Sequence, residues 1–425
     1  MKTDIQPLIP ALRFPEFEEE WEITKYGDIY TFYSTNSFSR EKLNYEDGGI
    51  RNLHYGDIHK SFATIFNLEK EIVPFINLDI DLSKIKEENY CKEGDLVIAD
   101  ASEDYSDIGK TIELSNLCGE KVLAGLHTFL ARPTDQTMAL GLAGYLLQSW
   151  NVRKQIMIIA QGTKVLGLST KRLSKINLPI PSLPEQRKIA SFLTTIDNRI
   201  QALEKKKSSL EQYKKGVMQK IFSQEIRFKD EDGKDFSEWK NRLFSEILYE
   251  HKLKSTGKEE VHSVSVHKGV INQIEHLGRS FASKNTSHYN RALPNDIIYT
   301  KSPTGNFPLG IIKQNHIKED VILSPLYGVF TPETKELGYI LHVHFDSAIN
   351  TSNYLSSIIQ KGAKNTINIT NKTFLSKKLN LPVSLKEQSK IANFLFALDN
   401  KIALVNEQIE KTKTYKKGLL QKMFV

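Results

Sequence analysis

The sequence predicts an α+β protein that contains two globular units and two long helices, arranged as an internal repeat. A long-helix segment occurs twice, at residues 185–222 and 387–424, with 17 identical residues over 38 aligned positions. Short motifs that flank the helix are also repeated, in the same order. The stretches between these motifs, residues 25–160 and 243–358, share almost no sequence. We therefore expect a constant frame that holds two different globular contents.

The two helix segments carry a coiled-coil pattern, because apolar residues recur at heptad a and d positions. A helix of this length spans about 57 Å and needs a partner along its apolar seam, so we expect the copies to pair. The alternative is two surface helices that pack separately on two domains. Lys214 and Lys416 occupy d positions and are expected to loosen one end of the coil. The seam residues are Ile189, Leu193, Ile196, Ile200, Leu203, Leu210 and Val217 in the first copy and Ile391, Leu395, Leu398, Ile402, Val405, Ile409 and Leu419 in the second.

The flanking motifs indicate where each unit begins and where each long helix starts. Leu12-Arg13-Phe14 followed by Trp21 returns as Ile226-Arg227-Phe228 followed by Trp239. Each helix is preceded by an apolar segment with proline, at residues 178–183 and 381–385, and proline favours extended backbone before a helix start. Further upstream, Gly162-Thr163-Lys164 is echoed by Gly362-Ala363-Lys364.

Short strand-like pieces also correspond between the otherwise unlike contents. They are Gly94 to Ile98 in the first unit and Asn295 to Tyr299 in the second. Repeated helices and motifs around two dissimilar globular stretches are typical of a molecule that holds two different recognition domains in equivalent positions. The alternative is an old duplication whose loops have simply drifted.

Composition places the chain among ordinary globular proteins and excludes several classes. It has 425 residues, 40% of them hydrophobic and 26% charged, which is enough for two or three domains. The start has no apolar signal region, and the longest apolar stretch, Met138 to Leu147, is too short to span a membrane. Two cysteines, Cys91 and Cys118, have no metal-binding or disulfide spacing. We expect a cytoplasmic protein.

The net charge of +7 lies on the helices. The two helix segments sum to +5 and +3, and the other 349 residues to −1. Binding to nucleic acid would therefore depend on local basic loops, with the helices as a positive bridge. The run Lys205-Lys206-Lys207 is better explained as the solvated face of a coil.

Taken together, these motifs resemble the specificity subunits of type I restriction-modification systems, over nearly the whole chain. The resemblance rests on the order and duplication of Leu-Arg-Phe to Trp, Gly-Thr-Lys to Leu-Ser, Leu-Pro-Ile-Pro to Glu-Gln, and a long helix that ends near Lys-Lys-Gly. It implies two target recognition domains separated by an antiparallel two-helix coiled coil, with pseudo-twofold symmetry. The implied boundaries are 1–183 for the first domain, 184–224 for the central helix, 225–385 for the second domain and 386–425 for the last helix.

The resemblance also implies a function and partners. Each domain would read one half of a split, asymmetric site in double-stranded DNA. Two methyltransferase subunits would bind the specificity subunit, and two restriction subunits would join them. The partners would use S-adenosylmethionine, Mg²⁺ and ATP, and this chain would bind no cofactor and do no chemistry.

The sequence agrees with a non-catalytic role. It has neither the Asn/Asp-Pro-Pro-Tyr/Phe motif of adenine methyltransferases nor a phosphate-binding Gly-X-X-X-X-Gly-Lys-Ser/Thr loop. The nearest imitation of a Mg²⁺ nuclease site is Asp296 with Glu333 and Lys335, but its acids lie 37 residues apart. His342 and His344 are expected on one face of a half-exposed strand, without a third ligand at metal spacing. We expect no metal site.

The candidate DNA-binding residues are polar or basic side chains near turn-forming residues, because Lys and Arg contact phosphates and Arg, Lys, Asn and Gln read base edges. Gly162 and Gly362 are explained equally well as turns with positive φ that end a helix. The candidates are Arg51, His54, Tyr55, Gln161, Thr163 and Lys164 in the first domain and Arg279, Lys301, Ser302, Asn306, Lys361, Lys364 and Asn365 in the second.

Two other functions remain open from the sequence. The first is a Mg²⁺-dependent restriction nuclease that acts alone, which would cut DNA as the purified chain. The second is a coiled-coil scaffold whose globular domains bind protein.

Overall fold

The computed structural model describes residues 8–135, 137–361 and 367–425. It divides into two compact units: unit 1 is Met1–Lys206 with Val405–Val425, and unit 2 is Lys207–Leu404. The two repeated segments form the long helices α6 (Leu183–Phe222) and α12 (Leu385–Lys422). Each unit therefore contains part of both helices, and neither unit is built from one repeat alone.

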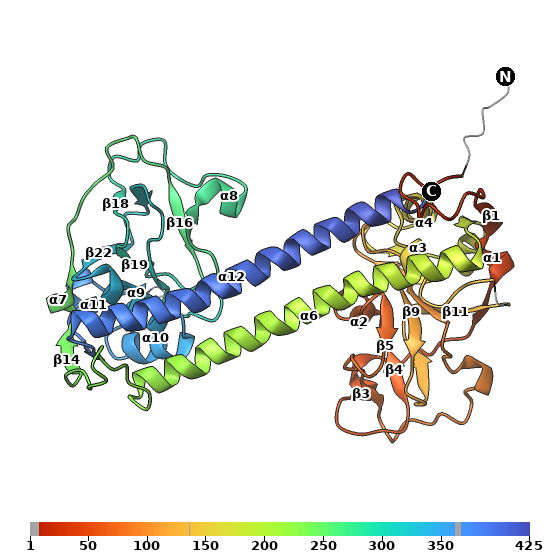
Figure 1. Ribbon diagram of the computed structural model, residues 1–425, viewed down its shortest axis with the longest axis horizontal. Coiled ribbons are helices and arrows are strands. Elements are labelled where there is room, and N and C mark those ends of the chain that lie inside the picture. Colours follow the sequence, from red (N-terminus) through yellow and green to blue (C-terminus); the bar gives the residue numbers. More distant parts are fainter. Residues whose placement is uncertain (1–7, 136, 362–366) are drawn as a thin grey trace. The chain divides into compact units, whose positions relative to one another are not determined.

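Within each unit, the two helices lie side by side and antiparallel (Figure 1). In unit 1, Ile189 and Leu193 near the start of α6 share a buried cluster with Leu419 and Met423 near the end of α12. In unit 2, Ile221 near the end of α6 is buried with residues from the start of α12. Of the expected seam residues, Leu203, Leu210, Val217 and Ile402 are half-buried and the others are buried.

The two d-position lysines do not loosen the helix pair, so that expectation is wrong. Lys416 Nζ lies 2.6 Å from Asp197 Oδ1, and Lys214 Nζ lies 2.6 Å from Asp399 Oδ1. The lysine side chains are only 16% and 14% exposed, because each ammonium lies along the seam and finds a carboxylate on the other helix.

A tyrosine completes each of these pairs. The Tyr145 hydroxyl donates to Asp197 at 2.8 Å, and the Tyr339 hydroxyl donates to Asp399. We call the two sets the Asp–Lys–Tyr triads. Each triad fastens the helix pair to the globular part of its own unit.

Both units contain a sheet whose four main strands follow the same spatial order. The order is β2-β11-β7-β9 in unit 1 and β15-β22-β19-β20 in unit 2, antiparallel throughout, and β5 adds a parallel fifth strand beside β9. The strands of unit 1 are β2 (Tyr30–Tyr33), β11 (Thr128–Pro133), β7 (Leu96–Ala99), β9 (Thr111–Asn116) and β5 (Ile65–Asn67). Those of unit 2 are β15 (Leu248–Tyr249), β22 (Gly328–Pro332), β19 (Ile297–Tyr299) and β20 (Ile312–Gln314). The expected strand pieces are thus confirmed as β7 and β19.

A second repeated feature leads into each long helix. The proline-containing segments form β13 (Asn177–Ile180) and β25 (Lys378–Leu381), which pair antiparallel with β1 (Glu22–Lys25) and β14 (Lys240–Leu243). The first turn of each helix then holds the segment in place, because Gln186 donates to Pro181 O and Gln388 to Pro382 O, both at 2.9 Å. The extended entry expected from the prolines is confirmed.

The smaller elements differ between the units. Unit 1 has a four-stranded sheet of β10 (Val122–Ala124), β4 (Arg51–Leu53), β6 (Phe75–Ile76) and β3 (Leu43–Asn44), and a pair of β8 (Ala101–Ser102) and β12 (Leu166–Gly167). Its short helices are α1 (Tyr26–Ile29), α2 (Tyr55–Lys60), α3 (Ala143–Leu146), α4 (Trp150–Ile159) and α5 (Thr170–Leu173). Unit 2 has the pairs β16 (His262–Ser265) with β17 (Gly269–Asn272), β18 (Asn290–Ala292) with β21 (Val321–Leu323), and β23 (Gln360–Lys361) with β24 (Ile367–Asn368). Its short helices are α7 (Phe244–Ile247), α8 (Gln273–Leu277), α9 (Lys335–Phe345), α10 (Ala348–Leu355) and α11 (Asn371–Phe374).

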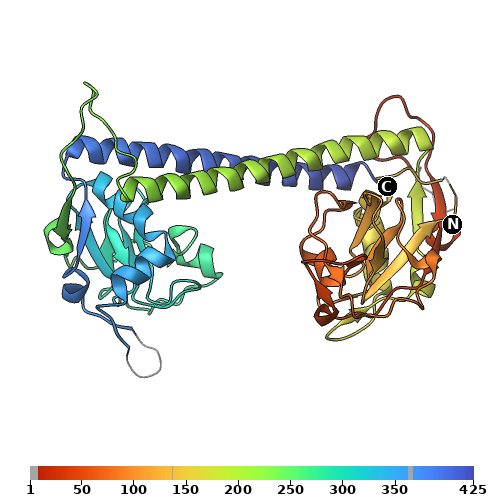
Figure 2. The same ribbon diagram turned by 90° about the horizontal axis from the view of Figure 1, so that it is seen from below.

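The segment with His342 and His344 is the helix α9, so its prediction as a strand is wrong. Thr334 caps the helix, its hydroxyl accepting from Leu337 N at 3.0 Å. One face of α9 packs on the long helices and the other on the sheet, so it forms a layer between them (Figure 2). Burial lowers the pKa of both histidines to about 4.

Candidate nucleic-acid interface

The shared sheet order brings equivalent loops to the end of β7 in unit 1 and the end of β19 in unit 2. His127 precedes β11 and lies beside Asp100, which follows β7, because Asp100 N donates to His127 O at 3.1 Å. In unit 2, Tyr327 precedes β22, the strand that pairs with β19. Each sheet therefore presents a ring-bearing side chain at the same place. We call these places the β7 edge and the β19 edge.

The β7 edge carries a cluster of rings centred on Tyr55, the first residue of α2. The Tyr55 ring lies 4.7 Å from His54, 6.0 Å from His59 and 5.3 Å from His127, measured between centroids. His54 caps α2, because its Nδ1 accepts from Gly56 N at 3.1 Å. Burial, together with the charge of Arg40, lowers the pKa of His54 and keeps its ring neutral.

His127 is the exposed member of this cluster. Its side chain is 51% exposed and its backbone φ is +54°, a conformation that costs free energy in a residue other than glycine. Its Nδ1 lies 3.3 Å from the Asp100 carboxylate, whose pKa is raised by burial. His127, His59 and Asp100 were not predicted from the sequence, and no local motif distinguishes them there.

A hairpin brings further predicted residues to the β7 edge. Gln161 and Gly167 bond to each other, and β12 pairs with β8, which follows β7 directly. Gly162 has φ +138°, and a Cβ there would lie 1.9 Å from Val165 O, so this turn requires glycine. The exposed side chains of Thr163 and Lys164 are thus carried on a tight, ordered loop.

Arg51 is placed differently from the other candidates of unit 1. Its guanidinium pairs with Glu120 at 2.6 Å, donates to Val73 O at 2.8 Å and lies 4.0 Å from the centre of the Phe75 ring. These contacts inside the unit occupy most of its donors. Arg51 therefore links β4 to Val73, Phe75 and Glu120 within unit 1.

In unit 2, the structure brings only part of the predicted set to the β19 edge. Lys301 and Ser302 follow β19 and are half-buried, and Asn306 is exposed in the same loop. Arg279 is exposed after α8, with its guanidinium 4.5 Å from the Phe281 ring. Lys361 belongs to β23, whereas Lys364 and Asn365 lie outside the described residues.

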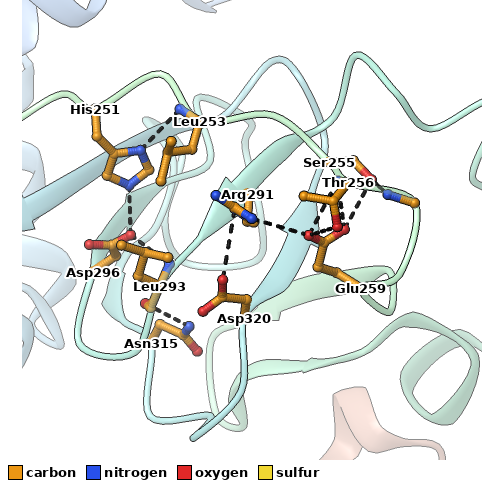
Figure 3. A network of polar contacts seen from close by, with 11 residues as sticks. His251, Leu253, Ser255, Thr256, Glu259, Arg291, Leu293, Asp296, Asn315 and Asp320 are labelled. Atoms are coloured by element: carbon orange, nitrogen blue, oxygen red, sulfur yellow. Dashed lines mark hydrogen bonds and ion pairs between the residues drawn. The ribbon is translucent and has the colours of Figure 1, made fainter.

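A network of buried polar contacts supports the β19 edge (Figure 3). His251 Nε2 lies 2.8 Å from the Asp296 carboxylate, which also accepts from Leu293 N at 2.7 Å. His251 Nδ1 accepts from Leu253 N at 3.1 Å, so one ring fixes the chain on both sides of Lys252.

The same network anchors the loop that follows. Arg291 lies 3.6 Å from Glu259 and 3.8 Å from Asp320, and Figure 3 shows it between the two carboxylates. Burial alone would raise the pKa of Glu259, but hydrogen bonds from Thr256 and Ser255 lower it to about 2. The segment that carries Lys252 and Lys254 is thus held on a rigid support.

A cavity of about 220 Å³ opens at the β19 edge above this support. It is lined by the segment 250–254, Asn290, Lys301, Pro325, Tyr327, Val329 and Asn371. Lys252 and Lys301 both have positive φ, +57° and +55°. Lys252 and Lys254 were not among the candidates predicted from the sequence.

The structure separates the residues that imitated a nuclease site. Asp296 is fully buried in the network above, whereas Glu333 pairs with Arg242 at the surface. Among the described residues, no group of three His, Cys, Asp or Glu side chains is placed to hold a metal ion. In the described part of the chain, no helix is long and apolar enough to cross a membrane.

Two units that repeat one frame on a shared helix pair, each with its own polar edge, define a duplicated recognition protein. The model of the type I restriction modification DNA specificity domain matches residues 18–212 and 266–414. The chain belongs to this family, whose members are the non-catalytic DNA-recognition subunits of type I restriction-modification systems.

Individual relatives agree with this assignment. The putative type I restriction enzyme MjaX specificity subunit of Methanocaldococcus jannaschii is 24% identical over 94% of this chain and 92% of its own length. The type I restriction enzyme MjaVIII specificity subunit of the same organism is 27% identical over 51% of this chain and 48% of its own length.

Solved structures show that the fold is shared. The S subunit of a type I restriction-modification system from M. genitalium aligns with a TM-score of 0.58 at 16% identity, over 98% of this chain and 99% of that one. A chain from a study of complex assembly and conformational transition in a type I system aligns with a TM-score of 0.50 at 13% identity, over 94% and 96%. The expected architecture of two recognition domains and two paired long helices is therefore confirmed.

Proposed function

We propose that unit 1 and unit 2 each read one half of a bipartite, asymmetric site in double-stranded DNA, through the β7 edge and the β19 edge. The observation that carries this proposal is that one sheet order ends in two different sets of side chains. The β7 edge presents His and Tyr rings with the Lys164 hairpin, and the β19 edge presents lysines around a cavity. Rings and amide groups suit base edges, and ammonium groups suit phosphates.

The test exchanges the variable stretch of unit 1 and leaves the repeated helices and motifs in place. Replacing residues 25–160 by the matching stretch of a relative with a known target should change one half of the methylated sequence and leave the other half unchanged. Methylome sequencing of cells that carry the swapped chain gives the result. A change in both halves would show that the units do not read independently. The purified chain with Mg²⁺ should leave plasmid DNA uncut, and cleavage would favour a nuclease instead.

We also propose that the helix pair docks two methyltransferase subunits, which two restriction subunits then join, and that these partners bring S-adenosylmethionine, Mg²⁺ and ATP. The docking proposal rests on a repeated feature of the outer helix face. Tyr213 and Tyr415 are 53% and 56% exposed at equivalent positions of the repeat, one in each unit. Exposed tyrosines often anchor protein interfaces, since each buries a large ring and offers one hydroxyl.

Each tyrosine is followed three residues later by a glycine inside the helix, Gly216 or Gly418. Glycine in a helix costs roughly 1 kcal/mol relative to alanine. A Cβ at either position would meet nothing within 4 Å, so packing inside the chain does not require glycine there. A partner backbone that approaches closely beside the tyrosine would require it, and the repetition supports two copies of one partner.

The docking test uses native mass spectrometry with the cognate methyltransferase. Tyr213→Asp and Tyr415→Asp should each reduce the complex from two methyltransferases to one, and the double variant should bind none. Tyr249→Asp is the matched control, because Tyr249 is 71% exposed and belongs to β15 and not to a long helix. Unchanged stoichiometry in the double variant would show that the methyltransferase does not dock at these tyrosines.

A further inference from the structure

Three lysines and one carboxylate line the cavity at the β19 edge, and the carboxylate, Glu250, accepts from Asn371 Nδ2. Lys252 and Lys301 line it, and neither ammonium has an ion pair or hydrogen bond with any residue in the described part of the chain. Lys254 also lines it, but its ammonium donates to Asn290 Oδ1 at 2.6 Å and to His288 O at 3.2 Å. Two of the three lysines are therefore free to bind a ligand.

The backbone at both lysines has a strained conformation. Six non-glycine residues in the described part of the chain have positive φ, and Lys252 and Lys301 are two of them. Each such residue costs of order 1 kcal/mol, and strained residues concentrate at binding sites. His251 fixes the turn at Lys252, and Gly310 packs against the backbone of Lys301, since a Cβ at Gly310 would lie 3.1 Å from Lys301 N.

One buried acceptor beside the cavity, Asn371 Oδ1, lacks a hydrogen-bond partner among the described residues, and a donor such as an ammonium or a water could satisfy it whereas a phosphate oxygen could not. Asn371 Nδ2 donates to Glu250 at 2.7 Å. Burial lowers the pKa of Lys301, although the charge of Glu250 opposes this. A half-buried ammonium without a partner is costly, and an anion in the cavity would remove that cost. The volume corresponds to roughly seven water molecules, ample for a hydrated phosphate group.

We propose that this cavity binds a phosphate group of the DNA backbone, with Lys301 and Lys252 as its ligands, and so sets the register of unit 2 on the duplex. The proposal rests on the proposed function of unit 2 and adds a division of labour within it. A phosphate contact positions a protein without reading sequence, whereas exposed side chains such as Asn306 are left to contact bases. The proposal therefore predicts a loss of affinity that does not depend on sequence.

The experiment measures binding of the complex with its cognate methyltransferase to cognate and scrambled duplexes over a range of salt. Lys252→Met with Lys301→Met should weaken binding to both duplexes by a similar factor, about tenfold or more. It should also reduce the slope of log K against log salt by roughly one to two, for one or two lost phosphate contacts. The ratio of cognate to scrambled affinity and the methylated sequence should stay the same.

Two control variants separate this role from a structural one. Lys258→Met removes an exposed lysine of the same loop that does not line the cavity, and it should leave the salt slope unchanged. Lys301→Arg keeps the charge and should retain most of the affinity, with an unchanged melting temperature.

Three outcomes would overturn the proposal. A double variant with wild-type affinity would show that the cavity does not contact DNA. A collapse of the cognate-to-scrambled ratio would show that these lysines read bases. Broadening of the ³¹P signal of inorganic phosphate that is lost in the double variant, while DNA affinity and its salt slope stay at the wild-type values, would assign the cavity to a small phosphorylated molecule. If the wild-type complex itself fails to bind DNA, the proposed function fails instead.

Discussion

Replacing Lys416 by methionine tests whether the Asp–Lys–Tyr triad stabilises unit 1. The substitution keeps the length of the side chain and removes the ammonium from Asp197. The two side chains are 16% and 21% exposed. A matched control exists in the same unit, because Lys413 and Glu204 also pair between the helices, at 2.7 Å, but are 49% and 48% exposed.

The magnitude follows from this difference in exposure. Breaking a buried pair costs roughly 3–5 kcal/mol, because it leaves a charge without a partner, and an exposed pair contributes about 0–1 kcal/mol. The Asp197 pair lies between these limits, so we expect Lys416→Met to lower the free energy of unfolding by about 2 kcal/mol. At about 2–4 °C per kcal/mol for a domain of this size, the melting temperature should fall by about 4–8 °C.

Differential scanning calorimetry of the single variants, and of Lys416→Met combined with Asp197→Asn, gives the measurement. The double variant removes both charges, so it should recover part of the loss and yield a coupling of about 1–2 kcal/mol. Lys413→Met should shift the melting temperature by about 0–4 °C, less than Lys416→Met does. Equal shifts for Lys416→Met and Lys413→Met would refute the argument, because burial would then make no difference.

Three further predictions concern pH, strain and the frame. The pKa of His344 is about 4, below its usual 6.5, so the stability it contributes to unit 2 is present above pH 6.5 and lost as pH falls towards 4. Between pH 7 and pH 4.5, the His344→Phe variant should therefore lose about 2–2.5 kcal/mol less unfolding free energy than the wild type, and equal losses would contradict the prediction. His127→Gly should leave the melting temperature unchanged or raise it slightly, since φ is +54°, yet weaken binding to the first half-site about tenfold in a gel-shift assay; a loss of both would assign His127 a structural role. Gln388→Ala should lower the free energy of unfolding of unit 2 by about 1–3 kcal/mol, because Pro382 O and the Thr334 hydroxyl lose a partner; Gln408→Ala, at an exposed position of the same helix, is the control, and an equal loss in that variant would count against a stabilising role of these Gln388 contacts.

The long helices and their flanking motifs were predictable from the sequence because their residues recur at a constant spacing. The first helix was expected from Glu185 to Phe222 and is found from Leu183 to Phe222. The partners of Asp197 and Asp399 were not predictable, since Lys416 lies 219 residues from Asp197 and only the fold brings them together. Once the antiparallel pairing is known, the repeat makes the second pair a consequence of the first.

The strand predicted at α9 is wrong because burial on most sides removes the contrast between apolar and polar faces that identifies a helix. His342-Val343-His344 alternates like a strand, but most of α9 is buried, so its helical period does not stand out in the sequence. The signal that was missed is Thr334, a helix-capping residue type just before Leu337, Ile340 and Leu341.

The candidate sites were only partly predictable, for a different reason. Lys301 was a candidate because Pro303 and Gly305 mark its loop. Lys252 and His127 were missed, because glycine usually marks positive φ in a sequence and neither position has one. Arg51 has a suitable residue type, but its contacts with Glu120 and Phe75 are long-range and could not be read from its neighbours.

The division of the chain has a consequence for its synthesis on the ribosome. Unit 2 is one continuous stretch, Lys207–Leu404, and can fold as it emerges, whereas unit 1 needs Val405–Val425 to cover Ile189 and Leu193. At about 5–20 residues per second, translation of the intervening residues takes roughly 10–40 s. The first unit to be made is thus the last to be completed, and its apolar seam stays open to chaperones and proteases in the meantime. A premature stop after Leu404 would leave the second unit complete and would remove part of the buried core of the first.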